Sequence, residues 1–262
     1  MPMTAMIRNL AKMQTLDILQ GEYLMKVANQ ITDVAMLKKA RVHPIQLLLA
    51  KVIYDEGKGD RGSLTWTPNP EVSTALERAF YASFVHVPAT NKRFCLALDV
   101  SSSMTWARIA NSCLNARQAS VAIALNLLKV EKNVECVGFS HTLCELPYNG
   151  NWTLGRVHDH MNNVPFGATD CSLIMQWARK EKKEFDVFIV FTDNETYHGE
   201  EHPYVALQKY RKESGIDARL IVAGMTATEF TIADPEDAGM LDVVGFDSAV
   251  PELIHNFIEG KI

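Results

Sequence analysis

Oxygen-bearing side chains follow apolar runs of this sequence at places where buried strands are expected to end. Asp99, Ser101 and Ser103 follow the run "FCLAL" at alternate positions, so an extended backbone would place all three on one side. Thr169 lies in "FGATDCS", before an expected helix, and Asp193 follows the apolar run in "FIVFTDNE". In open α/β sheets, ligands bind beyond the carboxyl ends of the strands. The five side chains are therefore candidates for one binding site.

This candidate site contains two carboxylates and three hydroxyls, with no histidine or cysteine. Such hard oxygen ligands suit Mg²⁺ or Mn²⁺ and are unattractive to Zn²⁺. Two formal negative charges leave residual positive charge on a dication, so one coordination position would stay open for water or for a partner's carboxylate. An alternative stays open, in which the serines cap a helix starting near Trp106 and the two aspartates are solvated strand ends.

The pattern of residues 93–262 predicts an α/β fold that would position these side chains. Short apolar runs alternate with segments of helical length, which favours a doubly wound, mostly parallel sheet with helices on both faces. The expected strands are 94–98, 134–139, 187–191, 220–223 and 243–246, with residues 142–146 pairing antiparallel with the strand before them. The expected helices are 107–132, 154–163, 172–183, 203–213 and 251–259.

Residues 1–88 are typical of short helices joined by turns, which predicts a helical-repeat fragment ahead of an α/β domain at 89–262. The expected helices are 3–13, 22–32, 34–40, 44–54 and 70–84. Charge divides in a similar way: residues 1–92 hold 11 Lys+Arg against 8 Asp+Glu, whereas residues 93–262 hold 15 against 23. The acidic part suits a cation site better than a nucleic-acid surface.

Basic side chains on the helical part could contact RNA, or they could simply be solvated. They are Arg8, Lys12, Lys26, Lys38, Lys39, Arg41, Lys51, Lys58 and Arg61. The longest apolar stretches fall short of a bilayer span, so no membrane partner is expected. The first residues lack a secretory signal, and the five cysteines form no C-x-x-C pair. These features predict reduced thiols in a cytoplasmic protein, which could also be nuclear in a eukaryote.

Catalytic motifs are weak in this sequence. His198 and His202 have the spacing of a zinc helix, but a glycine and a following proline indicate a turn that enters a helix. Cys171 has no general base beside it in the sequence. Metal-assisted hydrolysis at the candidate site would need Glu195 as the base. We therefore expect a binding protein and no enzymatic activity.

Several long motifs resemble a known family. "FCLALDVSSSM", "GATD" and "FTDNE" are similar to the metal-ion-dependent adhesion site of von Willebrand A domains. That resemblance implies that the five candidate residues are its metal ligands. "MPMTAMIRNLAKM", "KKARVHP", "RGSLTW" and "FTIADPEDAGMLD" resemble the C-terminal half of the Ro ribonucleoproteins, which join a ring of helical repeats, the TROVE domain, to a von Willebrand A domain.

The resemblance implies a function in RNA metabolism. Ro proteins bind small noncoding Y RNAs on the outside of the ring, take the 3′ ends of misfolded RNAs through its hole, and serve RNA quality control. Because "MPMTA" lies in mid-chain in that family, most of the ring would be absent from this sequence. Two functions stay open. One is Ro-type RNA binding with metal-dependent binding of a partner's acidic side chain; the other is a stand-alone metal-dependent protein-interaction module without RNA binding.

Overall fold

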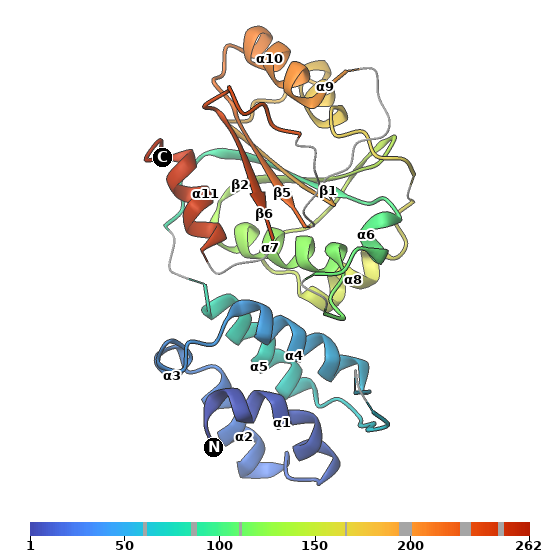
Figure 1. Cartoon of the computed structure of the whole chain (residues 1–262), viewed down its shortest axis with the longest axis vertical. Helices are drawn as coiled ribbons and strands as arrows, with labels where there is room; N and C mark the ends of the chain where they lie inside the picture. Colours follow the sequence, from blue (N-terminus) through green and yellow to red (C-terminus); the bar gives the residue numbers. More distant parts are fainter. Residues whose placement is uncertain are drawn as a thin grey trace. The chain divides into compact units, whose positions relative to one another are not determined.

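The chain folds into two compact units. A computed structural model describes residues 1–59, 62–84, 88–109, 112–165, 167–193, 201–225, 232–245 and 249–262. One unit comprises Met1–His86 with Asp247–Pro251, and the other comprises Val87–Phe246 with Glu252–Ile262. The first is helical and the second is an α/β unit (Figure 1).

Local capping signals start the helices of the helical unit. The Asp33 side chain accepts a hydrogen bond from the Met36 N–H, and Asn69 accepts one from the Glu71 N–H. Each predicted helix of this unit is confirmed to within two residues at either end. The observed helices are α1 (Met3–Thr15), α2 (Gly21–Ile31), α3 (Val34–Lys39), α4 (Pro44–Glu56) and α5 (Pro70–Ala82).

Lys51 does not belong to the set of basic residues that could contact RNA, because it is buried, with 5% of its surface exposed. Its ammonium donates to Asp55 at 2.7 Å and to the Ser73 hydroxyl at 2.8 Å, and it lies 3.5 Å from Glu77. Its charge is therefore neutralised inside the helical unit. Arg61 lies outside the described residues. The exposed members of the set are Arg8, Lys12, Lys26, Lys38, Lys39, Arg41 and Lys58.

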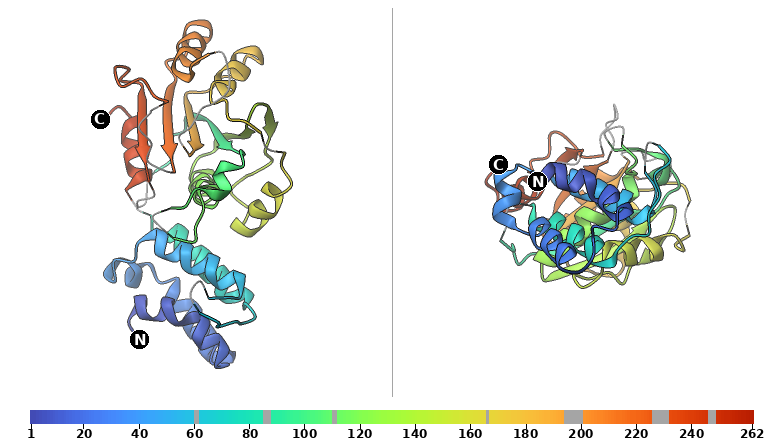
Figure 2. Two further views of the ribbon diagram at one scale, coloured as in Figure 1. Left: turned by 45° about the vertical axis from the view of Figure 1, so that its right-hand side comes forward. Right: turned by 90° about the horizontal axis from the view of Figure 1, so that it is seen from below.

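A mostly parallel sheet forms the centre of the α/β unit, as predicted. In the described residues it has six strands in the order β3-β2-β1-β4-β5-β6. β2 and β3 pair antiparallel, also as predicted, and the other neighbours are parallel; β4, β5 and β6 lie side by side in Figure 2. The strands are β1 (Arg93–Asp99), β2 (Asn133–Phe139), β3 (Leu143–Glu145), β4 (Val187–Thr192), β5 (Arg219–Gly224) and β6 (Met240–Val244).

Helices cover both faces of this sheet (Figure 1). On one face, Cys95 and Ala97 of β1 belong to a buried cluster with side chains of α9 and α10, and α7 and α11 lie on the other face. No helix in the described residues has the length and apolar character that crossing a bilayer requires. The helices are α6 (Ser103–Trp106), α7 (Ala116–Val130), α8 (Leu154–Met161), α9 (Leu173–Lys180), α10 (Pro203–Ser214) and α11 (Val250–Ile258).

The prediction of one helix over 107–132 is wrong. The chain forms α6 and α7, and the connection between them is not helical at 107–109 and 112–115. Arg108 and Asn115 pair in an antiparallel bridge within that connection. Asn115 and Gln118 form a capping box, in which each side chain accepts a hydrogen bond from the other's backbone N–H, and this box fixes the start of α7.

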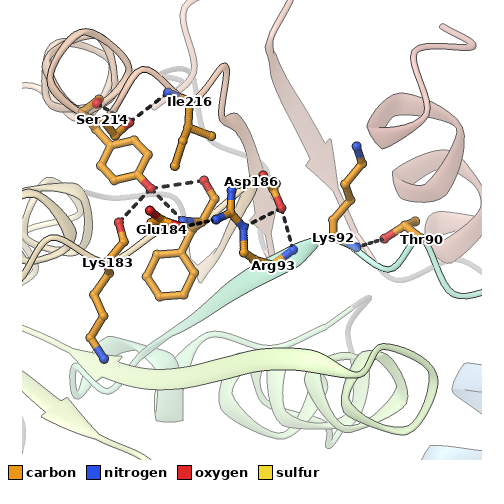
Figure 3. A network of polar contacts seen from close by, with 10 residues as sticks. Thr90, Lys92, Arg93, Lys183, Glu184, Asp186, Ser214 and Ile216 are labelled. Atoms are coloured by element: carbon orange, nitrogen blue, oxygen red, sulfur yellow. Dashed lines mark hydrogen bonds and ion pairs between the residues drawn. The ribbon is translucent and has the colours of Figure 1, made fainter.

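Charged side chains form ion pairs at the end of the sheet where strands β1 and β4 begin (Figure 3). The Asp186 carboxylate accepts hydrogen bonds from the backbone N–H, Nε and Nη2 of Arg93 at 2.8, 3.0 and 2.7 Å. Glu184 also forms an ion pair with Arg93. Hydrogen bonds from Arg93 hold the pKa of Asp186 below its ordinary value.

Candidate metal site

The carboxyl ends of β1 and β4 lie next to each other where the strand order changes direction. β2 lies on one side of β1 and β4 on the other. In open α/β sheets, ligands bind at such a switch point, beyond the carboxyl ends of the strands. Asp99 is the last residue of β1, and Asp193 directly follows β4. The fold therefore brings two carboxylates from distant parts of the sequence to the position at which such sheets bind ligands.

Asp99 connects the two strand ends. Its side chain is almost fully buried, with the residue 1% exposed. Oδ1 accepts a hydrogen bond from the Ser101 N–H at 2.8 Å, and Oδ2 accepts one from the Thr192 hydroxyl at 2.9 Å. Thr192 is the last residue of β4, so this bond ties β4 to β1 beside Asp193. The carboxylate is held in one orientation by groups from both strands.

The two serines of the loop after β1 lie close to each other. Ser101 is buried, and its Oγ lies 2.9 Å from the Oγ of Ser103. Ser103 opens the short helix α6. Ser102 has helical backbone angles, so the extended backbone expected from the sequence ends before Ser103, and the turn into α6 brings the two hydroxyls into contact. Neither serine caps α6: its N-cap position is Ser102, which makes no side-chain capping bond.

The loop containing Thr169 is attached to the same edge of the sheet. The Asp170 N–H donates to the Ser140 carbonyl at 3.0 Å, and Ser140 directly follows β2. The Asp170 carboxylate is engaged locally, since its Oδ1 accepts from the N–H and the hydroxyl of Ser172 at 2.9 and 2.6 Å. Thr169 is itself buried, with 5% exposed. These bonds hold the loop that precedes α9 near the ends of the central strands.

The surroundings of Asp99 disfavour a negative charge that has no counter-charge. Burial raises the pKa of Asp99 to about 6, and the nearby Asp193 adds to that rise. Hydrogen bonds from Ser101 and Thr192 act in the opposite direction and are outweighed. Two carboxylates near each other in a buried place would be stabilised by a cation between them.

Arg117, which the sequence analysis did not single out, is a buried cation beneath this loop. It is 7% exposed, and its Nη2 donates to the carbonyls of Val100 and Ser101 at 3.2 and 3.3 Å. Its Nε has no hydrogen-bond partner in the described part of the chain. Burial lowers the pKa of Arg117, while attraction to Asp99 raises it. Arg117 is the only charged residue in 116–128, and that isolated charge in an apolar helix was the available signal.

The donor set fits a hard dication. The described residues contain no cluster of three or more His, Cys, Asp or Glu side chains that could hold a metal. A metal here would therefore depend on hydroxyl and water oxygens in addition to Asp99 and Asp193. Mg²⁺ and Mn²⁺ accept such ligands, so the assignment of the five residues as metal ligands remains a prediction that fits their chemistry.

His202 and Cys171, which were considered as a zinc ligand and a catalytic residue, have structural roles. His202 is the N-cap of α10, and its Nδ1 accepts from the Tyr204 N–H at 3.4 Å. Cys171 is fully buried, just before α9. His198 and Glu195, the base that hydrolysis would need, lie outside the described residues.

Comparison with known sequences gives a consistent result over the whole chain. Residues 93–258 match the family described as the Ro60 vWA domain, and residues 1–52 match the TROVE domain. The RNA-binding protein RO60 of Caenorhabditis elegans is 51% identical over 100% of this chain and 41% of its own length. The RNA-binding protein RO60 of Deinococcus radiodurans is 40% identical over 99% of this chain and 50% of its own. The chain spans about half the length of these curated relatives.

The solved structures agree with the fold. The crystal structure of the Deinococcus radiodurans RO (RSR) protein is similar with a TM-score of 0.78 and 40% sequence identity. The match covers 99% of this chain and 53% of that one. The predicted fold class, a von Willebrand A domain preceded by a helical part, is confirmed by this similarity and by the family match.

Proposed function

Since this chain belongs to the Ro60 family, we propose that it acts as a Ro-type RNA-binding protein whose α/β unit binds a partner protein through a divalent cation. Its RNA ligands would be small noncoding Y RNAs and misfolded RNAs in quality control. The match of residues 1–52 to the TROVE domain carries the RNA part, and the similarity to two RNA-binding proteins supports it. The proposal includes a cytoplasmic location and no enzymatic activity.

The exposed basic residues of the helical unit are the proposed RNA contacts. Lys38, Lys39 and Arg41 lie close together at and after the end of α3, and all three are exposed. Contacts of this kind bind phosphates and release counterions, so affinity should fall steeply as salt rises. The acidic α/β unit is expected to contribute little.

A gel-shift series with a stem-loop RNA at rising salt tests this part. The full chain should shift the RNA at low salt, and K38A/K39A/R41A should weaken the shift and reduce its salt dependence. The matched control is K180A/K182A/K212A, which removes three exposed basic residues from the α/β unit. No shift at low salt, or equal weakening by both triple variants, would contradict RNA binding through the helical unit.

The α/β unit would hold Mg²⁺ or Mn²⁺ through Asp99, Ser101, Ser103, Thr169 and Asp193. The observation that supports this is the pair of buried carboxylates at adjacent strand ends, with the two serine hydroxyls in contact beside them. The bound cation would supply an open coordination position for an oxygen of the partner. The residues of the chain fix the position of that cation and keep its charge only partly compensated.

Calorimetric titration of the full chain with Mn²⁺ and Mg²⁺ tests the metal part. We expect one saturable site per chain that a chelator empties. Absence of a saturable site would contradict the proposed ligand set.

A second candidate is a metal-dependent interaction module that binds no RNA. The acidity of residues 93–262 favours it. It predicts that partner capture is abolished by a chelator and unaffected by ribonuclease, with no RNA shift at any salt concentration. The Ro-type proposal instead predicts that ribonuclease releases part of the captured material.

A further inference from the structure

Trp106 stands out on the face that carries the proposed metal site, because it is 78% exposed. It is the last residue of α6, the helix that begins at the proposed ligand Ser103. The Ala107 N–H donates to the Ser103 carbonyl at 2.9 Å, which closes this turn. Residues three apart on a helix have Cβ atoms about 5–6 Å apart. The indole is therefore tied to a position one helical turn from the proposed cation.

An exposed tryptophan at such a place is costly unless a partner covers it. Trp152, in the same α/β unit, is 8% exposed, and Trp177 packs against the ring of Phe185 at 6.0 Å. Tryptophan is among the residues that contribute most to protein–protein affinity, since its large apolar surface is buried on binding. Trp106 has the properties of such an anchor.

The charges around the site indicate the chemistry of the partner. In the described residues of the surrounding loops, 100–109, 112–115, 140–142, 164–165 and 167–172, the exposed ionisable side chains are Arg108 and His141. On these loops the one carboxylate is Asp170, which is buried and hydrogen-bonded. In the described part of the loop after β4, Asp193 is a proposed ligand, and Glu201 forms ion pairs with two basic side chains of the α/β unit. The face therefore favours an acidic group over a basic one.

Net charge distinguishes a short acidic peptide from a nucleic acid. Residues 93–262 hold 23 Asp+Glu against 15 Lys+Arg, which disfavours approach of a polyanion. A single carboxylate instead meets the local field of the cation and of Arg108. We propose that Trp106 is the anchor for a segment of a partner protein that carries an Asp or Glu and a large apolar residue two positions away. This inference rests on the proposed metal site and adds the specificity of that site.

In the docked arrangement, the acidic side chain of the segment completes the coordination of the cation, and the apolar side chain packs on the indole of Trp106. Side chains two positions apart on an extended segment lie on the same side, about 6–7 Å apart, which is close to the spacing from Ser103 to Trp106. The metal supplies the charge contact, and Trp106 selects among acidic segments.

Selection of displayed random heptapeptides on the full chain, in Mg²⁺ and in EDTA, tests the inference. We expect Mg²⁺-dependent enrichment of peptides with an acidic residue two positions from a large apolar one. For one such selected peptide, Trp106→Ala should reduce affinity at least about 10-fold and leave Mn²⁺ affinity unchanged. Tyr23→Ala is the matched control, because Tyr23 is an aromatic residue of similar exposure, 68%, on the helical unit.

The outcomes separate this inference from the function on which it rests. Equal peptide binding by wild type and Trp106→Ala, with loss in Asp99→Ala, would overturn the role of Trp106 and leave the metal site standing. Peptide binding that is unaffected by both EDTA and Asp99→Ala would overturn the metal site itself. Failure to enrich any peptide, or tighter Mg²⁺-dependent binding of single-stranded oligouridylate that requires Trp106, would overturn a protein partner.

Discussion

The two ends of strands β1 and β4 carry aspartates in opposite electrostatic situations. Where the strands begin, Asp186 accepts three hydrogen bonds from Arg93, and its pKa is lowered. Where they end, Asp99 lies buried near Asp193, and its pKa is raised to about 6. The same pair of strands therefore has a charge-compensated carboxylate where the strands begin, which we call the compensated edge. It has a carboxylate without a full counter-charge where they end, which we call the uncompensated edge.

The difference separates a carboxylate that stabilises the fold from carboxylates that, in the proposed function, bind a cation. A carboxylate paired with Arg93 contributes to stability directly. Two carboxylates gathered without a full counter-charge cost stability, and such sites are concentrated where proteins bind or react. The comparison predicts that variants at the two edges have opposite consequences for metal affinity and for stability.

The largest effect should come from removing one carboxylate at the uncompensated edge. Asp99→Ala should lower Mn²⁺ affinity at least about 100-fold, because loss of a direct ligand exceeds the effect usual for groups behind the ligands. Asp186→Ala is the control at the other edge and should leave Mn²⁺ affinity unchanged. Calorimetry measures both. A similar change in the two variants would remove the distinction between the edges.

The second effect concerns pH in the absence of metal. The folded protein retains the Asp99 proton up to about pH 6, whereas the unfolded chain releases it near the ordinary value of 3.8. The free energy of unfolding should therefore fall as pH rises from about 4 to 7, by on the order of 2 kcal/mol. Asp99→Asn lacks this ionisation, so its stability relative to wild type should increase over that interval. Urea unfolding in EDTA at several pH values measures the difference.

Asp186 gives the opposite sign in the same experiment. Its pKa is lowered in the folded state, so its contribution is present above its ordinary value and is lost as pH falls below it. Asp186→Asn should therefore converge with wild type in acid. Parallel stability profiles for wild type, Asp99→Asn and Asp186→Asn would contradict the contrast between the two edges.

The third effect is the contribution of the compensated edge to the free energy of unfolding at neutral pH. Asp186→Ala should lower the free energy of unfolding by about 2 kcal/mol, because it removes three hydrogen bonds to a charged group. Glu184→Gln is the matched control, since Glu184 pairs with the same Arg93 but its side chain is 70% exposed. An exposed pair contributes about 0–1 kcal/mol, so this variant should be nearly neutral. Thermal or urea unfolding distinguishes them.

The smallest effect should come from Arg117, which supports the loop without reaching the cation. Arg117→Met removes the donors to the carbonyls of Val100 and Ser101, so the loop should lose its fixed shape and Mn²⁺ affinity should fall about 10-fold. Arg117→Lys, which keeps the charge and one donor, should recover part of that loss. If Arg117→Met instead bound Mn²⁺ more tightly, repulsion between the guanidinium and the cation would dominate.

Much of the architecture could be read from local patterns. Asp33, Asn69 and the prolines at 44 and 70 mark helix starts that the structure confirms, because caps depend on neighbouring residues alone. The connection between α6 and α7 was missed because helical periodicity was followed through it. The capping pair Asn115 and Gln118 was present in the sequence and would have placed the start of α7.

The residue types that follow each strand, and with them the hard-oxygen character of the candidate site, can be read directly from the amino-acid order. Which of these side chains meet depends on the three-dimensional fold. The Thr192 hydroxyl reaches Asp99 across 93 residues of sequence, and Arg117 reaches the carbonyl of Val100 from a helix on one face of the sheet. Such contacts depend on strand order and on helix placement over the sheet. Residue periodicity fixes the elements and their buried faces but leaves that order undetermined.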